Sequence, residues 1–130
     1  MKSTAIAYIT ALLVMVAMDA LWLGFIAKPL YQQGIGHLMA DAPNLVAAAV
    51  FYFLFPAGLV FFAVLPERSW TSTLTAAALF GFFTYATYDL SNLATLKGWP
   101  ISLAVIDMGW GCLIATASAA ASKAALATVR

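Results

Sequence analysis

Four apolar stretches, each long enough to cross a lipid bilayer as a helix, make up most of this chain. A hydrocarbon core of about 30 Å requires about 20 mostly apolar residues per helix. The stretches cover residues 4–27, 44–65, 72–96 and 101–122. Of the 130 residues 65% are apolar and 8% charged, whereas soluble domains have about 45–50% and about 25%. Because so small a chain cannot bury this much apolar surface, we predict an all-α membrane protein, a four-transmembrane-helix bundle.

The breaks between the stretches carry residues that end and begin helices. Pro29 follows the first stretch, Asn44 is suited to cap the second, and Pro100 is suited to the first turn of the fourth. The loop 28–43 leaves room for a short interfacial helix. No stretch has the composition of a linker, so we expect a single domain over residues 1–130.

Positive charge near the helix ends predicts the orientation in the membrane. Four basic residues flank the helices on the side of the termini and two on the other side: Lys2, Arg68, Lys123 and Arg130 against Lys28 and Lys97. This bias predicts that both termini are cytoplasmic. Trp70 and Trp99 are then expected in the aromatic belts of opposite interfaces.

Three aspartates, Asp19, Asp89 and Asp107, fall inside the expected helices. Each costs about 2.5–3.5 kcal/mol at a helix centre, so such residues are rare and mark functional sites. At 1.5 Å per residue, Asp19 and Asp89 lie roughly 12 Å, and Asp107 roughly 10 Å, from the outer ends of their helices. We therefore expect the three carboxyl groups in one layer, at the depth of Tyr52 in the second helix.

Aromatic and polar residues share the faces of these aspartates. On the first helix, Asp19, Trp22 and Ile26 lie on one face by the helical period. Polar groups in hydrocarbon must face protein or water, so we predict one pocket that opens toward the outer side. Besides the aspartates, its expected lining is Trp22, Tyr85, Tyr88, Asn92 and Trp110, with Tyr52 and the loop residue His37 as weaker candidates.

The charges of this layer have no basic partner in the expected helices. Like charges disfavour one another's ionisation, so protons or a cation must accompany the three carboxyls. The spacing of His residues typical of a zinc or iron site is absent, and the single Cys112 excludes a multi-cysteine cluster, so we predict no resident metal. Six Lys+Arg against five Asp+Glu leave no basic patch for nucleic acid.

Several segments resemble a family of small bacterial inner-membrane proteins known as domain of unknown function 2177. They are DALWLG at 19–24, YATYDLSNLAT at 85–95, Trp99-Pro100, and DMGWG at 107–111. The tyrosine–aspartate segment is the most specific of them, and the resemblance covers nearly the whole chain. The resemblance implies four membrane helices and the bacterial inner membrane, and it implies no activity.

The favoured functional hypothesis is a pocket that binds or processes a small cationic or amphiphilic molecule, held by charge and cation–π contact. An enzyme would use one aspartate as general base and a second, protonated one as acid. No nucleophile or cofactor motif is recognisable, so enzymatic activity and cofactor stay open. Two alternatives also stay open: a proton-coupled small transporter acting as a homodimer, and an accessory membrane subunit with structural carboxylates.

Overall fold

The computed structural model describes residues 2–130, so Met1, the first residue of the expected domain, lies outside the described part. These residues form helices and no strand, which confirms the all-helical prediction. The helices are α1 (Lys2–Leu21), η1 (Trp22–Ile26), α2 (Lys28–Ile35), η2 (Gly36–Leu38), α3 (Leu45–Leu59), η3 (Val60–Val64), α4 (Trp70–Thr95) and α5 (Ile101–Ala127). The fourth long helix runs five residues beyond the expected residue 122, to Ala127.

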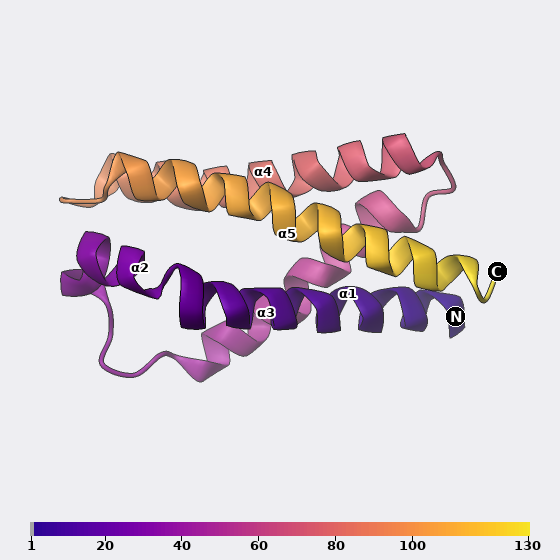
Figure 1. The fold of residues 1–130 in the computed structure, drawn as a ribbon, viewed down its shortest axis with the longest axis horizontal. Helices are drawn as coiled ribbons and strands as arrows, with labels where there is room; N and C mark the ends of the chain where they lie inside the picture. The colour runs from indigo at the N-terminus through magenta and orange to yellow at the C-terminus, as the bar shows by residue number, and fades with distance from the viewer. Residues whose placement is uncertain (1) are drawn as a thin grey trace.

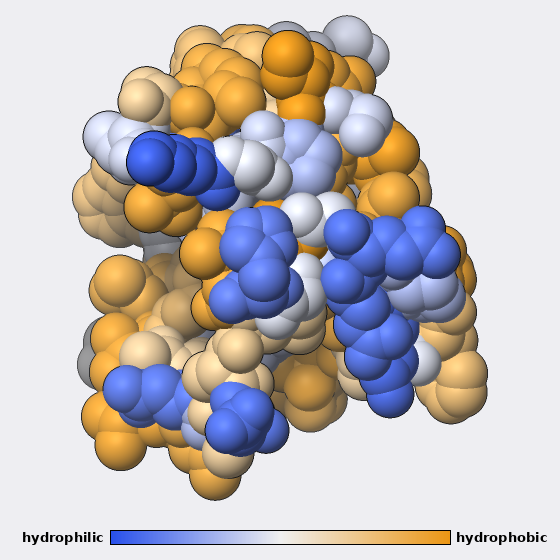
Figure 2. All heavy atoms as spheres, turned by 90° about the vertical axis from the view of Figure 1, so that its left-hand side faces the viewer, coloured by the Kyte–Doolittle hydropathy of each residue, from blue (hydrophilic) through white to orange (hydrophobic). Residues whose placement is uncertain are grey.

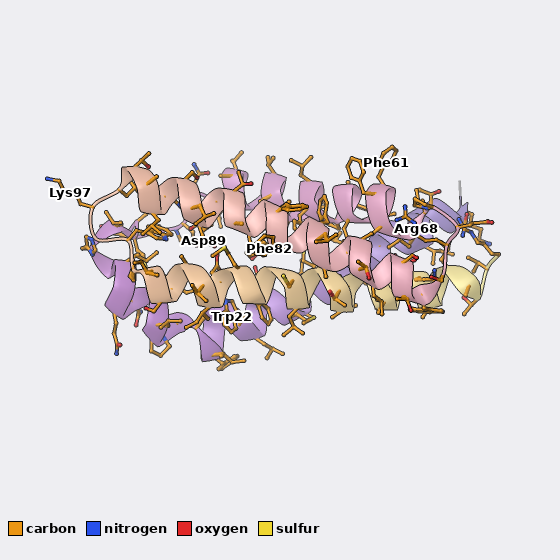
Figure 3. All side chains as sticks on the ribbon, turned by 90° about the horizontal axis from the view of Figure 1, so that it is seen from above. Trp22, Phe61, Arg68, Phe82, Asp89 and Lys97 are labelled. Carbon is orange, nitrogen blue, oxygen red and sulfur yellow. The ribbon has the colours of Figure 1, made fainter. Side chains whose placement is uncertain are left out.

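α1, α4 and α5 extend along roughly one direction, and α3 runs obliquely to them (Figure 1). The start of α1, the end of α5 and the loop 65–69 form one end, which we call the terminal end. The opposite end, which we call the loop end, holds α2, η2 and the loop 96–100. Arg68 and Lys97 lie at these opposite ends (Figure 3). α5 packs along both α1 and α4, whereas α3 crosses behind α1 and approaches α4 chiefly through η3.

Among residues 2–130, three helical segments are long and apolar enough to cross a membrane. They are Lys2–Ile26, Leu45–Val64 and Ile101–Ala127. α4 is 26 residues long but carries more Ser, Thr and Tyr, and it does not meet the same criterion of hydropathy. The apolar surface is exposed as expected of a membrane protein: Phe25, Leu45 and Val46 are among the most exposed side chains.

Local sequence accounts for the starts of the helices around the site. The Asn44 side chain accepts a hydrogen bond from the backbone N–H of Ala47 at 3.1 Å, which confirms the predicted cap of α3. Pro100 immediately precedes α5. Gly98, with a φ of 75°, takes a backbone conformation that other residues avoid and so allows the sharp turn between α4 and α5.

Small residues bring α4 and α5 into close contact. A Cβ atom added to Gly81 would lie 2.1 Å from the backbone oxygen of Gly111 and 2.7 Å from the Cβ of Ala115. A Cβ atom added to Gly111 would lie 2.4 Å from the ring of Tyr85. Packing at this distance holds α4 and α5 together, and neither glycine can be replaced without moving them apart.

α1 and α3 each end in a π-helical turn, η1 and η3, which includes one more residue than an α-helical turn. Because of the wide turn η1, the residues that follow Asp19 face a different direction from the one they would have in a continuous α-helix. The prediction that Ile26 lies on this face is therefore wrong: Ile26 is 65% exposed, and Ala27 is buried in its place.

Trp99 is not the aromatic-belt residue that the sequence predicts. Its side chain is only 7% exposed and packs in a small cluster with Ile35, Leu103 and Ala104 at the loop end. Gly98 turns the chain back toward the bundle, and the indole of the next residue is carried inward rather than toward the interface. This cluster also holds α2 against α5.

Candidate functional site

A cavity of about 1000 Å³ lies on the loop-end half of the molecule. Residues from η1, α2, α3, η3, α4 and α5 line it, together with Asp19 of α1. Figure 2 views the loop end, where polar side chains gather, and shows a notch at the left-hand edge of the molecule. The notch separates the upper part, with α4 and α5, from the lower part, with α1 to α3 (Figure 1). Of the residues expected to form a pocket, the lining includes Asp19, Trp22, Tyr52, Tyr85, Tyr88, Asp107 and Trp110.

Asp19 joins three long helices. Its carboxylate accepts hydrogen bonds from the hydroxyl of Tyr52 on α3 and from the indole N–H of Trp110 on α5, the latter at 3.1 Å. Asp19 lines the cavity, and it is 5% exposed. The depth predicted for Tyr52, level with the aspartates, agrees with this contact.

Asp107 accepts a hydrogen bond from the hydroxyl of Tyr31 at 2.5 Å. That hydroxyl in turn accepts a weaker bond from the indole N–H of Trp22 at 3.4 Å. Burial raises the pKa of the Tyr31 phenol above its usual range, and the adjacent Asp107 carboxyl raises it further. Tyr31 therefore stays a hydrogen-bond donor. Its bond to Asp107 holds α2 against the N-terminal part of α5.

The rings of Trp22 and Trp110 stack, with centroids 4.4 Å apart and planes only 5° from parallel. One ring comes from η1 and the other from α5, so the pair closes the gap between these segments. Their N–H groups point to different partners: Trp22 donates to Tyr31 and Trp110 to Asp19. The stacked pair thereby connects the two carboxylates that line the cavity.

Asp89 is fully buried on α4 and lies between the ribbons of α4 and α5 (Figure 3). Within residues 2–130, neither of its carboxyl oxygens has a hydrogen-bond partner, and the indole N–H of Trp99 has none either. The carboxyl of Asp107 and the indole of Trp99 are its polar neighbours. A buried polar group without a hydrogen-bond partner lowers the stability of the fold. Asp89 differs in this from Asp19 and Asp107, which both accept hydrogen bonds.

Tyr85 lies at the centre of the site. All three carboxyl groups, those of Asp19, Asp89 and Asp107, lie close enough to act on its phenol electrostatically. Its ring rests on Gly111 and meets the edge of Phe55 at 6.0 Å between centroids. The three aspartates therefore lie near one shared side chain.

Two of the expected residues lie away from the cavity lining. Asn92, one turn after Asp89 and Tyr88, is not part of the lining. His37 is exposed in η2, and its imidazole lies beside Gly98, where an added Cβ would be 3.4 Å from Nε2. Tyr88 does line the cavity, and its ring meets Trp99 edge-on at 5.8 Å between centroids.

Positive charge is scarce around these carboxyls. The ion pair found within the described residues joins Arg130 to Glu67 at 3.6 Å, at the terminal end. Lys28 lines the cavity at its loop-end rim but forms no ion pair by the same criterion. No group of three His, Cys, Asp or Glu side chains in residues 2–130 is arranged to hold a metal ion.

Tyr31 and Trp99 were not predicted as neighbours of the aspartates. Tyr31 and Asp107 are 76 positions apart in the sequence, and their contact depends on α2 folding back over α5. One sequence signal was available: Tyr31 and Ile35 recur at helical spacing in the loop where a short helix was expected. No signal marks the inward turn of Trp99.

Comparison with known families gives a match over most of the chain. The sequence model of a family described as predicted membrane protein (DUF2177) matches residues 4–124. This match confirms the resemblance found in segments 19–24, 85–95 and 107–111. No curated protein and no solved structure matches the chain.

Proposed function

We propose that this chain, which belongs to the DUF2177 family of predicted membrane proteins, binds a small cationic or amphiphilic molecule in its cavity. We place it in a bacterial inner membrane, with four transmembrane helices in a single domain and both termini cytoplasmic. α4 is 26 residues long and packs along α5, which supports a fourth crossing beside the three apolar ones. In this orientation the cavity opens toward the outer side.

The observation that carries the proposal is an aromatic cavity whose carboxyl groups have no basic partner in the described chain. Asp19 and Asp107 line the cavity, and neither forms an ion pair with a Lys or Arg of the described chain. Their donors are the neutral groups of Tyr52, Trp110 and Tyr31. A cationic group placed among these rings would gain both charge attraction and cation–π contact.

One observation favours the alternative of structural carboxylates. Asp19 holds α1, α3 and α5 together, and Asp107 holds α2 to α5, as a purely structural role would require. Asp89 does not fit that role, because both of its buried oxygens lack a hydrogen-bond partner within residues 2–130. An unpaired buried carboxyl is instead what a proton-coupled transporter would use. The experiment below therefore distinguishes ligand binding from a structural role and from proton-coupled transport.

The test is binding of a hydrophobic quaternary ammonium ion to the protein in lipid nanodiscs. The stacked Trp22 and Trp110 line the cavity, so their fluorescence reports its occupancy. We expect saturable quenching in the wild type and at least roughly tenfold weaker binding in Asp19→Asn and Asp107→Asn, the loss of about 1.4 kcal/mol. Glu67→Gln, which removes a carboxylate at the terminal end, is the matched control and should bind normally.

Two results would contradict the proposal. Absence of saturable binding in a folded wild type would favour structural carboxylates. Equal binding by wild type, Asp19→Asn and Asp107→Asn would place the ligand elsewhere. Saturable binding that also releases protons, by a protein whose mass in detergent is that of a dimer, would favour proton-coupled transport over simple binding.

A further inference from the structure

The cavity has a polar end and an apolar end. Its polar lining gathers toward the loop end and comprises Asp19, Lys28, Tyr31, Tyr52, Tyr88 and Asp107. Its lining toward η3 is aromatic or small: Phe55, Ala57, Gly58, Phe62 and Phe80. The hydroxyl of Thr84, at this second end, already donates to the backbone oxygens of Phe80 and Gly81. A ligand that matches this lining is polar at one end only.

The apolar end has the length of an alkyl chain. From Tyr52, which marks the depth of Asp19, the lining continues along α3 and η3 to Phe62. The ten steps from Tyr52 to Phe62 correspond to roughly 15 Å of helix. The tip of the Phe80 ring packs directly on Gly58, since a Cβ atom added to Gly58 would lie 2.8 Å from it.

The cavity opens on an exposed and largely apolar side of the bundle. α3 and α4 approach each other at η3 and diverge toward the loop end (Figure 1). The residues along this gap are exposed: Phe51 by 41%, Leu54 by 68% and Tyr88 by 50%. At membrane depth, an apolar cavity open to the hydrocarbon is filled by a chain rather than by water, because water there lacks polar partners.

We propose that the ligand is a single-chain amphiphile with a cationic head, which enters from the bilayer between α3 and α4. The chain lies along Gly58, Phe62 and Phe80, and the head lies among the carboxylates of Asp19 and Asp107. This inference rests on the proposed function, because it names the ligand class of the same cavity. The unpaired negative charge selects the cationic head, and the apolar length selects the chain.

Shape, rather than hydrophobicity, determines how well the chain binds. An alkyl chain that leaves lipid for an apolar cavity exchanges one apolar environment for another, so little hydrophobic free energy is gained. A side chain that fills the apolar end therefore acts by overpacking. Gly58→Leu would push the Phe80 ring into the path of the chain, whereas Gly109→Leu adds the same side chain at a position with open space around it.

The experiment is photocrosslinking in nanodiscs with hexadecyltrimethylammonium that carries a diazirine at the end of its chain. In the wild type we expect crosslinks at Phe62 and Phe80, and competition by the unlabelled compound but not by hexadecyl sulfate, which has the opposite charge. Gly58→Leu should lower this labelling roughly tenfold, because the larger side chain overpacks the apolar end of the cavity. Ala57→Leu, on the same wall, should lower it too, and Gly109→Leu should leave it unchanged.

The outcomes separate this inference from the proposed function. Labelling that is spread over the lipid-facing surface, or equal in Gly58→Leu, Ala57→Leu and Gly109→Leu, would overturn the chain placement. Competition by hexadecyl sulfate as strong as by the ammonium compound would overturn the cationic head. In either case, the proposed function would still stand if a short quaternary ammonium ion binds in an Asp19-dependent manner. Loss of that binding as well would remove both.

Discussion

Tyr31 shows how one phenol outside the membrane-spanning helices connects a loop helix to the site. Burial and the neighbouring Asp107 raise its pKa above the usual 10.0. The folded protein therefore retains this proton in alkaline solution while the unfolded chain releases it. By linkage, the folded state is fully favoured below pH 10.0 and loses stability as the pH rises further.

Tyr31→Phe removes the group that titrates and its hydrogen bond to Asp107. We expect the variant to be less stable than the wild type near neutral pH, by about 0.5–1.5 kcal/mol for one hydrogen bond. Above pH 10 the difference should shrink, because the wild type alone loses the contribution of this phenol. Denaturant unfolding of both proteins from neutral to alkaline pH measures it. The control is Tyr8→Phe, which removes the phenol bonded to the backbone oxygen of Phe53. A stability difference between Tyr31→Phe and the wild type that stays constant as the pH rises would contradict the expectation.

The aspartates differ in what they contribute to the stability of the fold, although their positions in the sequence look equivalent. Asp19 accepts two side-chain hydrogen bonds, and Asp89 accepts none within the described chain. Asp19→Asn replaces bonds to a charged acceptor by weaker neutral ones, and we expect a loss of about 1–2 kcal/mol. Asp89→Asn removes an unpaired buried carboxyl, so its stability should be equal to that of the wild type or higher. Unfolding in mixed micelles measures both, and a larger loss in Asp89→Asn would show that Asp89 is structural.

At the residue scale, spacing along the helices predicted part of the site. Three-residue spacing from an aspartate singled out Trp22 and Trp110, and both rings line the cavity. What each side chain bonds to could not be predicted, because Trp110 donates to Asp19 on another helix rather than to Asp107 on its own. Such pairings depend on how the helices are rotated about their axes. The helical period shows which residues share a face of a helix, but it does not show which other helix that face contacts.

At the scale of the helices, the contact between α4 and α5 depends on the absence of side chains at two positions. Gly81→Ala would place a methyl group 2.1 Å from the backbone oxygen of Gly111, which cannot move aside as a flexible side chain can. We expect a loss of at least about 1–3 kcal/mol, or failure to fold. Gly109→Ala, on the same pair of helices but with nothing within 4 Å, should be neutral. Unfolding or thermal aggregation of the two variants in detergent measures the contrast, and equal stability would show that the helices can separate freely.

The helices themselves were largely predictable, because apolar length and the residues at the breaks mark where a helix must begin and end. Asn44 and Pro100 lie at the starts of α3 and α5, as the sequence indicates. The π turns η1 and η3 were not predictable. A wide turn inserts one residue without any distinctive residue type, and it shows only in the rotation that exposes Ile26 and buries Ala27.

At the scale of the whole molecule, charge is distributed unevenly between the two ends. Lys123 at the terminal end donates to the backbone oxygen of Arg68 at 2.6 Å and to the hydroxyl of Thr73 at 2.8 Å, and it lies 5.3 Å from the centre of the Trp70 ring. Arg130 pairs with Glu67 nearby. These contacts hold basic side chains at one end of the bundle, which supports the cytoplasmic placement of that end.

The orientation and the fourth crossing can be tested together, because Glu67 and Lys97 flank the two ends of α4. In a Cys112→Ala background, single cysteines at position 67, 97 or 128 are labelled in intact cells with a membrane-impermeant maleimide. We expect labelling at 97 alone, and labelling at 67 and 128 only after the membrane is opened. The positive-inside bias predicts that positions 67 and 128 are cytoplasmic. The length of α4 predicts that positions 67 and 97 lie on opposite sides of the membrane. Labelling of 67 and 97 from the same side would show that α4 does not cross the membrane. Labelling of 67 and 128 alone from outside would reverse the orientation and open the cavity toward the cytoplasm.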